Sequence, residues 1–331
     1  METNVLRDTV FDGVAFSAFM AESTDNFSVN LTHATMLNVI DEYIKHRCIT
    51  HPKFHLQWTT TKKYLHGLEF LCQQTIMPDR VSELFYPHLI KYMLQQGCAT
   101  STVERTCSQL RSALEWGSRY GAPISPSYDK CDFVGRCREK TILSYAELCH
   151  LYYFDIRTLP KHRRDWYERM ERTRDMFIFS VILGQRHSDV IRVNKSCFED
   201  ELFSITQQKT GNHVQFKWLE YAFDYKIAKA IMQKYDYTCP YPVSLSVYDR
   251  SLHELFRAIG MEFMQEIKNE EKILGVIQTT TTPRWKMIGS HTARRTAISF
   301  WSNKGMHVNK LRKFSGHSDL RSLQEYMLDE D

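Results

Sequence analysis

Apolar residues recur every three or four positions through the first third of the chain, which is the spacing of amphipathic helices. Residues 34–46, 59–75 and 100–120 each show this period. Pro78 stands where the first turn of another helix would begin, a position that proline favours. The pattern therefore predicts a module of four helices.

Residues 100–120 give the clearest of these helical patterns. Ser101 and Glu104 have the spacing of a capping box, which favours a helix start at this point. One side of the predicted helix is apolar and carries Val103, Cys107, Leu110 and Leu114. The opposite side is polar and carries Arg105, Ser108, Ser112 and Arg119.

The segment that follows loses this periodicity. Residues 121–138 contain two prolines and two glycines, which is typical of a linker. The sequence thus predicts four regions: an N-terminal arm or short helix at 1–30, a helical domain at 31–121, a linker at 122–138 and a second domain at 139–331.

The second domain mixes two periods. Ser144 and Glu147 predict another capped helix, and the nearly continuous apolar run at 175–183 predicts a buried helix that ends at Gly184. The period then changes to two. Strands are predicted at 201–206 and 213–218, around a turn at 209–212, and helical patterns resume at 225–235 and from 246 onward. The predicted fold is mainly α with a small antiparallel β-sheet (α+β).

Composition and charge narrow the class of protein. The chain has 331 residues, 43% of them apolar and 25% charged, as in soluble globular proteins. Because there is no apolar run of about 18 residues and no signal-peptide pattern, we expect a cytoplasmic protein with no membrane partner. Nine scattered cysteines are expected to be reduced thiols. A net charge of +4 permits nucleic-acid binding without requiring it.

Several cationic residues are candidates for an anion site. His291 and Arg294 are three positions apart in a predicted helix at 290–301, so they share one face. Arg186 directly follows the buried helix, and Asp189 is expected to hold it in place. Each feature alone also fits a plainer interpretation, a surface arginine or an ordinary Arg–Asp pair.

Three further residues have equally plain alternatives. Lys209 stands in the predicted turn, where an exposed lysine is common, although a turn can also deliver an ammonium group to a leaving oxygen. His317 follows Gly316, which ends a predicted helix at 308–314. Tyr326 comes nine residues later, and a tyrosine at such a place usually belongs to the core.

Taken in order along the chain, these residues resemble the signature of the tyrosine recombinase (phage integrase) family. The local sequence agrees in four segments: LGQRHSDV, ITQQKTGNHVQF, HTARRTAISFW and LRKFSGHSDLRSLQEYM. The resemblance covers residues 128–331, and the helices of 31–120 resemble the family's core-binding domain more loosely. With about 30 residues before the first helix, the chain resembles the simple type that lacks an arm-binding domain.

The resemblance implies a role for each matching residue. Tyr326 would be the nucleophile that attacks a DNA phosphodiester and forms a 3′-phosphotyrosyl bond. Arg186 and Arg294 would hold the non-bridging oxygens as charge builds in the transition state.

The remaining matches would move protons. Lys209 would protonate the departing 5′-oxygen. His291 and His317 would donate hydrogen bonds to the phosphate, and His291 would also assist proton transfer at the tyrosine. No metal, ATP or other cofactor is implied.

The resemblance also implies partners. These are double-stranded DNA carrying a recombination site with inverted repeats, and further copies of the chain in a tetramer on paired sites. The two domains would form a C-shaped clamp on the DNA, in a nucleoid-associated protein. Candidate DNA contacts are Arg105, Arg119, Lys62, Lys63, Arg284 and Arg295.

The sequence departs from the family pattern in three places. Gln185 stands where leucine is common, which we interpret as a packing variation. Residues 261–286 are longer than the minimal pattern, and TTTTPRW within them is expected to be an exposed loop that touches DNA. Only five residues follow Tyr326, so the usual exchange of C-terminal tails between subunits is in doubt.

Three other interpretations stay open. One is a type IB topoisomerase-like enzyme with the same chemistry. Another is a non-catalytic DNA-binding protein on the same fold. The third is a metal site in HRCITHPKFH, formed by His46, Cys48, His51 and His55, although irregular spacing makes surface histidines the better interpretation.

Overall fold

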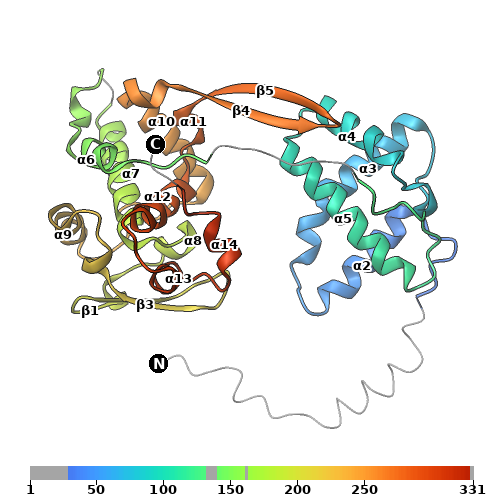
Figure 1. Ribbon diagram of the computed structural model, residues 1–331, viewed down its shortest axis with the longest axis horizontal. Coiled ribbons are helices and arrows are strands. Elements are labelled where there is room, and N and C mark those ends of the chain that lie inside the picture. Colours follow the sequence, from blue (N-terminus) through green and yellow to red (C-terminus); the bar gives the residue numbers. More distant parts are fainter. Residues whose placement is uncertain (1–28, 132–139, 161–162, 329–331) are drawn as a thin grey trace, which may run out of the picture. The chain divides into compact units, whose positions relative to one another are not determined.

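The protein divides into two compact units in a computed structural model that describes residues 29–131, 140–160 and 163–328 (Figure 1). The first unit comprises Met1–Arg136 together with Lys272–Gln278, and the second comprises Cys137–Glu271 together with Thr279–Asp331. Most of the predicted arm at 1–30, and residues 132–138 of the predicted linker, lie outside the described residues.

The first unit contains the four predicted helices. They are α2 (Met36–Cys48), α3 (Thr59–Cys72), α4 (Phe85–Gln95) and α5 (Thr100–Ser118), with short 3-10 turns η1 (Phe54–Trp58) and η2 (Pro78–Arg80) between them. Pro78 begins η2, so it opens a single turn that precedes the helix. These helices, blue to green in Figure 1, enclose a large apolar core, and a second, smaller cluster includes Val39 of α2 and Trp116 of α5.

The polarity of α5 follows the sequence pattern. Val103, Cys107, Leu110 and Leu114 are buried, whereas the four residues of the predicted polar side are exposed. The capping-box prediction is wrong. The helix begins two residues earlier, with Ala99 as an N-cap that makes no side-chain hydrogen bond, so Ser101 already lies inside the helix.

The second unit is built around α7 (Arg164–Leu183). Its helices also include α6 (Tyr145–Tyr153), α8 (His187–Val190), α9 (Tyr225–Lys234), α10 (Leu245–Ile259), α11 (Arg284–Met287), α12 (Ser290–Asn303), α13 (Val308–Ser315) and α14 (Leu320–Gln324). Of these, α6, α9, α10 and α12 pack against α7. The predicted capping box of Ser144 and Glu147 is present at the start of α6. Gly184 ends α7 in the left-handed conformation, as predicted.

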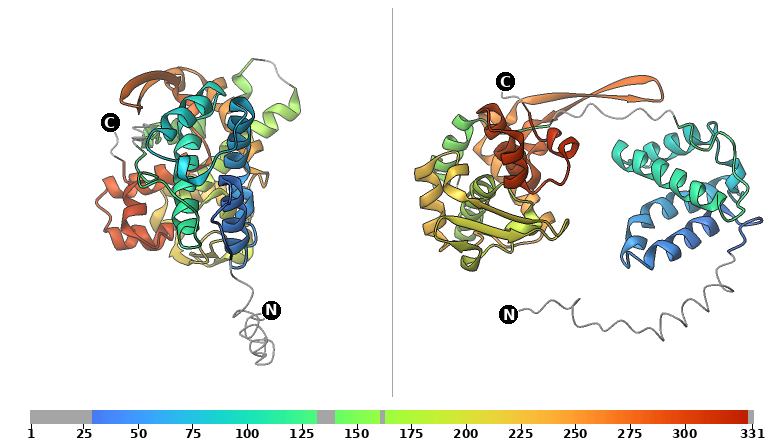
Figure 2. Two further views of the ribbon diagram at one scale, coloured as in Figure 1. Left: turned by 90° about the vertical axis from the view of Figure 1, so that its right-hand side faces the viewer. Right: turned by 60° about the horizontal axis from the view of Figure 1, so that its bottom comes forward.

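A three-stranded antiparallel sheet accompanies these helices. It consists of β1 (Phe198–Glu199), β2 (Leu202–Thr206) and β3 (His213–Lys217), in that order. Ile205 is paired with Val214, and both are buried because alternate residues face the core. Helix α13 packs against β3, as the two views of Figure 2 allow the reader to follow. Short 3-10 turns complete the unit: η3 (Ile156–Thr158), η4 (Lys195–Cys197), η5 (Trp218–Tyr221) and η6 (Met261–Met264).

A second pair of strands was not predicted. Strands β4 (Glu266–Ile273) and β5 (Val276–Pro283) form a two-stranded sheet. The TTTTPRW segment is therefore the end of β5 and the start of α11, and the prediction of a loop is wrong. Its threonines have high β propensity, but since most of β5 is exposed, no apolar alternation marks the strand in the sequence.

No helix in the part of the chain that the structure describes is long and apolar enough to cross a membrane.

Gly184 offers a test of this packing. It has φ +62°, and a β-carbon there would collide with the ring of Phe314. We expect Gly184→Ala to lower the free energy of unfolding by about 3 kcal/mol, from backbone strain and overpacking together. Urea titration followed by tryptophan fluorescence measures this change.

Gly275→Ala is the matched control, because Gly275 has φ +83° and a β-carbon added there would meet nothing within 4 Å. This variant should lose only the strain energy of about 1 kcal/mol. Equal losses in the two variants would contradict the proposed collision with Phe314.

Candidate active site

One cavity of the second unit gathers five of the six residues that the sequence singles out. The cavity has a volume of 570 Å³, and its lining includes Arg186, Lys209, His291, His317 and Tyr326. These residues come from the start of α8, the β2–β3 turn, α12 and the segment after α13. The sixth residue, the arginine of α12, lies beneath this surface.

Arg186 is placed by a pair of glutamines. It is the N-cap residue of α8, and its Nη1 donates to Oε1 of Gln207 over 2.9 Å. Gln207 belongs to the β2–β3 turn, and its Nε2 donates to Oε1 of Gln185 at 2.8 Å and to the carbonyl of Ser315 at 2.9 Å. The amide of Gln207 therefore joins the end of α7, the hairpin turn and the end of α13.

Gln185 makes hydrogen bonds within this network, so its interpretation as a packing variation is wrong. Its side chain is 1% exposed, and its Nε2 donates to the carbonyl oxygens of Leu183 at 3.0 Å and Phe314 at 2.7 Å. Leucine could not satisfy these buried carbonyl groups. Sequence reasoning missed both glutamines, because nothing in the local pattern signals a buried amide.

Asp189 does not hold Arg186 as expected. Its buried carboxylate accepts from the backbone N–H of Gln208 at 2.8 Å and lies 3.6 Å from Nη1 of Arg192. Among the described residues, no hydrogen bond or ion pair joins the carboxylate of Asp189 to the guanidinium of Arg186. The carboxylate instead fixes the backbone next to Lys209, at the turn of the hairpin.

Arg294 is fully buried in α12. Its Nη1 donates to the carbonyl of Gly184 over 3.1 Å, and its Nη2 lies 3.2 Å from Nε2 of His317. Its Nε–H has no partner among the described residues. Burial and the nearby Arg186 lower the pKa of Arg294 to about 9, against the opposing effects of Tyr326 and Asp189.

His317 is held in one tautomer by its neighbours. Since a guanidinium can only donate, Nε2 of His317 accepts from Arg294, and Nδ1 therefore carries the proton. Nδ1 lies 2.8 Å from Oγ of Ser315, which in turn donates to the carbonyl of Leu311 at 2.6 Å. Burial, Arg294 and Arg186 lower the pKa of His317 to about 3, so the ring is neutral.

Tyr326 lies beside this pair, just beyond the end of α14. Asp319 caps the start of α14, and the helix ends at Gln324. The Tyr326 ring centroid is 5.0 Å from that of His317 and 5.7 Å from the guanidinium carbon of Arg294. The structure therefore brings the expected nucleophile close to Arg294, one of the two arginines expected to bind the phosphate.

Lys209 and His291 stand at the cavity's edges. Lys209 is exposed in the turn between β2 and β3, where Gly211 adopts φ +69°. His291 lies in the first turn of α12. Desolvation by the surrounding protein, followed by the charges of Arg295, Arg294 and Arg186, lowers the pKa of His291. Its imidazole is thus kept neutral and able to accept a proton.

The charge at the base of the cavity is unbalanced. Among the hydrogen bonds and ion pairs of the described residues, neither Arg186 nor Arg294 has a carboxylate partner. Arg186 disfavours the charged form of Arg294, and a bound anion would relieve this repulsion. Arginine forks match the oxygens of phosphate well. The arrangement is suited to a phosphoryl group.

The candidate DNA contacts differ in exposure and in ion pairing. Arg105 and Lys63 are exposed, and Arg119 is exposed while paired with Glu115 at 3.1 Å. Lys62 donates to Asp41 at 2.7 Å.

The two remaining candidates belong to the second unit. Arg295 is half-buried, and burial lowers its pKa. Arg284 is wrong as a DNA contact, because it is mostly buried in an ion pair with Glu147 and also donates to the carbonyl of Ile142 at 2.8 Å. The ion pair ties α11 to the start of α6.

The metal-site interpretation finds no support. Among the described residues, which include His46, Cys48, His51 and His55, no three potential ligands lie close enough to hold an ion.

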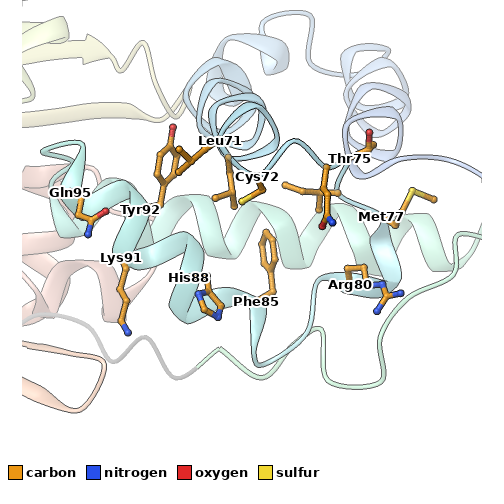
Figure 3. Close-up of a pocket in the computed structure, with 13 residues that line it drawn as sticks. Leu71, Cys72, Thr75, Met77, Arg80, Phe85, His88, Lys91, Tyr92 and Gln95 are labelled. Carbon is orange, nitrogen blue, oxygen red and sulfur yellow. The ribbon is translucent and has the colours of Figure 1, made fainter.

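A larger cavity lies in the first unit, between α3 and α4, with a volume of 890 Å³. Figure 3 shows that its basic residues, Arg80, His88 and Lys91, are spread along the cavity and do not converge on one point. Apolar side chains such as Leu71 and Phe85 also line it. The basic side chains of this larger cavity therefore do not form a common anion site.

Comparison with solved structures identifies the fold. The chain is similar to a lambda integrase tetramer bound to a Holliday junction, with 15% identity, a TM-score of 0.64, and coverage of 93% of this chain and 80% of that chain. It is similar to the Tn1549 transposon integrase in complex with a circular intermediate DNA, with 14% identity, a TM-score of 0.59, and coverage of 90% and 96%. A third likeness is to the XerH site-specific recombinase bound to difH, with 11% identity, a TM-score of 0.51, and coverage of 83% and 75%.

These likenesses show that the chain has the tyrosine recombinase fold, mainly α with small antiparallel sheets. Comparison with family models gives no match, and comparison with curated proteins gives none either.

Replacing Arg284 tests whether this residue stabilises the fold or contacts DNA. Arg284→Ala leaves the carboxylate of Glu147 mostly buried and unpaired, so we expect a loss of about 3 kcal/mol in the free energy of unfolding. DNA affinity should stay within about twofold of the unchanged protein. Arg119→Ala, which breaks an exposed pair, should cost no more than about 0.5 kcal/mol.

The depressed pKa of His317 makes stability depend on pH. Below a pH of about 6.5 the unfolded chain protonates this histidine, while the folded chain stays neutral down to about 3. The unfolded state then binds more protons, so stability falls as the pH falls. His317→Gln should flatten the slope between about pH 4 and 6 by up to about 1.4 kcal/mol per pH unit.

Urea titrations at several pH values measure this slope. His55→Gln, which replaces an exposed histidine of the first unit, is the control and should leave the slope as it is. An unchanged slope in His317→Gln would mean that the ring is protonated in the folded protein.

Proposed function

We propose that the protein is a site-specific DNA recombinase that cuts and rejoins strands through a covalent bond between Tyr326 and a 3′-phosphate. The observation that carries this proposal is the cavity in which Tyr326 stands with two histidines and a lysine, next to two arginines that have no carboxylate partner among the described residues. A phosphodiester is the anion that best fits these donors.

In the proposed reaction, Arg186 and Arg294 bind the scissile phosphate. A guanidinium has five N–H donors. Among the described residues, Arg294 donates to one carbonyl and to one neutral imidazole, and its Nε–H has no partner. As the phenolic oxygen of Tyr326 attacks phosphorus, charge builds on the non-bridging oxygens. Cations that are already fixed in place stabilise this charge more than they stabilise the ground state.

Two protons move in this step. The phenol proton passes to His291, whose lowered pKa keeps the ring neutral and able to act as a base. The P–O bond to the 5′-oxygen breaks, and Lys209 supplies the proton to that leaving group from the hairpin turn. His317 orients Arg294, and since Arg294 and Ser315 engage its two ring nitrogens, it has no N–H left to donate to the phosphate. Rejoining reverses these transfers.

The proposed chemistry needs neither a metal nor ATP. Cationic side chains stabilise the transition state, and the phosphotyrosyl bond retains the energy of the phosphodiester it replaces. A type IB topoisomerase would use the same steps, but it would relax supercoiled plasmid DNA that lacks paired recombination sites. A non-catalytic DNA-binding protein would form no covalent adduct at all.

The proposed partner is double-stranded DNA, recognised on inverted repeats by a tetramer of this chain. Arg105, Arg119 and Lys63 on the first unit are exposed cations suited to phosphate contacts. The lambda integrase of the first comparison is a tetramer bound to a Holliday junction. Inversion, excision and integration share this chemistry.

Replacing the nucleophile tests the proposal directly. Tyr326→Phe should abolish the SDS-resistant protein–DNA adduct because the attacking oxygen is gone, while DNA affinity should change by less than about twofold. The assay uses a nicked DNA substrate that traps the adduct, in buffer containing EDTA. An adduct in the Tyr326→Phe variant would rule out this nucleophile.

Removing either of the two phosphate-binding arginines should slow DNA cleavage strongly. Arg186→Ala and Arg294→Ala should each lower the rate of adduct formation by at least about 10²-fold, as loss of one oxyanion donor typically does. Arg164→Ala, at an exposed surface arginine, is the control and should keep the full rate. Rates near normal in both clamp variants would show that the phosphate binds elsewhere.

A further inference from the structure

The segment that carries Tyr326 is anchored through its main chain. Helix α14 ends at Gln324, so the backbone groups that follow need other partners. Ser299 of α12 supplies two of these bonds with one hydroxyl. Its Oγ donates to the carbonyl oxygen of Tyr326 at 2.7 Å and accepts from the N–H of Leu328 at 3.0 Å.

Two more side chains extend this anchor. Nδ2 of Asn303 donates to the carbonyl of Leu328 at 3.1 Å. Nζ of Lys140 donates to the carbonyl of Glu325 at 2.9 Å and lies 3.6 Å from the Glu325 carboxylate. Ser299 and Asn303 are four residues apart, so they share one face of α12. The backbone is thus held on both sides of Tyr326.

Ser299, which anchors the segment of Tyr326, and the phosphate-binding Arg294 lie on the same helix. Arg294 and Ser299 both belong to α12 and both are fully buried, so a rigid element connects the phosphate-binding cation to the support of the nucleophile. Without the anchor, the hydrogen bonds of this turn would be those from the N–H groups of Tyr326 and Met327 to the preceding turn of α14, which fix the phenol less firmly relative to Arg294. A displacement of about 1 Å can cost about 10²-fold in rate.

We propose that Ser299, assisted by Asn303 and Lys140, is a positioning residue that fixes Tyr326 for attack on the phosphate. The inference rests on the proposed function. It assigns to Ser299 an effect on the rate of cleavage at saturating DNA, and none on DNA affinity. A merely structural serine would affect stability and affinity along with rate.

The test measures adduct formation on a nicked DNA substrate at saturating concentration, together with the dissociation constant for the uncleaved site. Ser299→Ala should slow adduct formation by about 10- to 100-fold and change the dissociation constant by less than about twofold. Ser299→Thr keeps the hydroxyl and should recover most of the rate. Ser302→Ala, on the same helix, is the matched control and should behave as the unchanged protein.

Asn303 keeps the test valid if Ser299→Ala folds poorly, because the Asn303 side chain is exposed. Asn303→Ala and Lys140→Ala should each slow adduct formation by several-fold, with Lys310→Ala as the control for loss of an exposed lysine. Thermal unfolding of every variant reports its folding.

Rates within about twofold of normal in both Ser299→Ala and Asn303→Ala would overturn the inference, as would a loss of affinity that accounts for the loss of rate. If the unchanged protein forms no adduct, the proposed function itself fails. If it forms an adduct that needs Tyr326 but not Ser299, only the positioning role fails.

Discussion

The buried guanidinium of Arg294 is the constraint on which the second unit depends. A cation without a carboxylate partner is costly to bury, and the fold offsets this cost with dipoles. The carbonyl of Gly184 stands at the C-terminus of α7, where the helix dipole is negative, and accepts from Arg294. A neutral His317 accepts on the other side. Neither partner cancels the charge, so its field stays available to a phosphate.

Two amide side chains connect the elements around Arg294 by hydrogen bonds. Gln185 and Gln207 bond to each other and to the end of α13, so the end of α7, the hairpin turn and the end of α13 meet in one network. Because Arg186 donates to Gln207, the second arginine is placed by the same amides. The chemistry of the cavity is therefore built on neutral hydrogen-bonding groups that leave the cationic charge intact.

The periodic parts of this structure were predicted well from the sequence, and the rest was not. Helix α5 and strands β2 and β3 follow their apolar patterns, whereas β5 was expected to be a loop because its exposed threonines show no alternation. Motif order likewise indicated which residues would share the cavity, but not their partners. Arg284 was expected on DNA and is bonded to Glu147. Partners depend on which charges the fold buries together, and that information is spread over segments far apart in sequence.

The hydrogen bonds that anchor residues 325–328 depend little on the side chains of those residues. Ser299, Asn303 and Lys140 bond carbonyl and amide groups of the main chain, and every residue except proline possesses both. Positions 325 and 328 can consequently vary during evolution without displacing the phenol between them. Proline at 328 is the exception, because its ring nitrogen carries no hydrogen to give to the hydroxyl of Ser299.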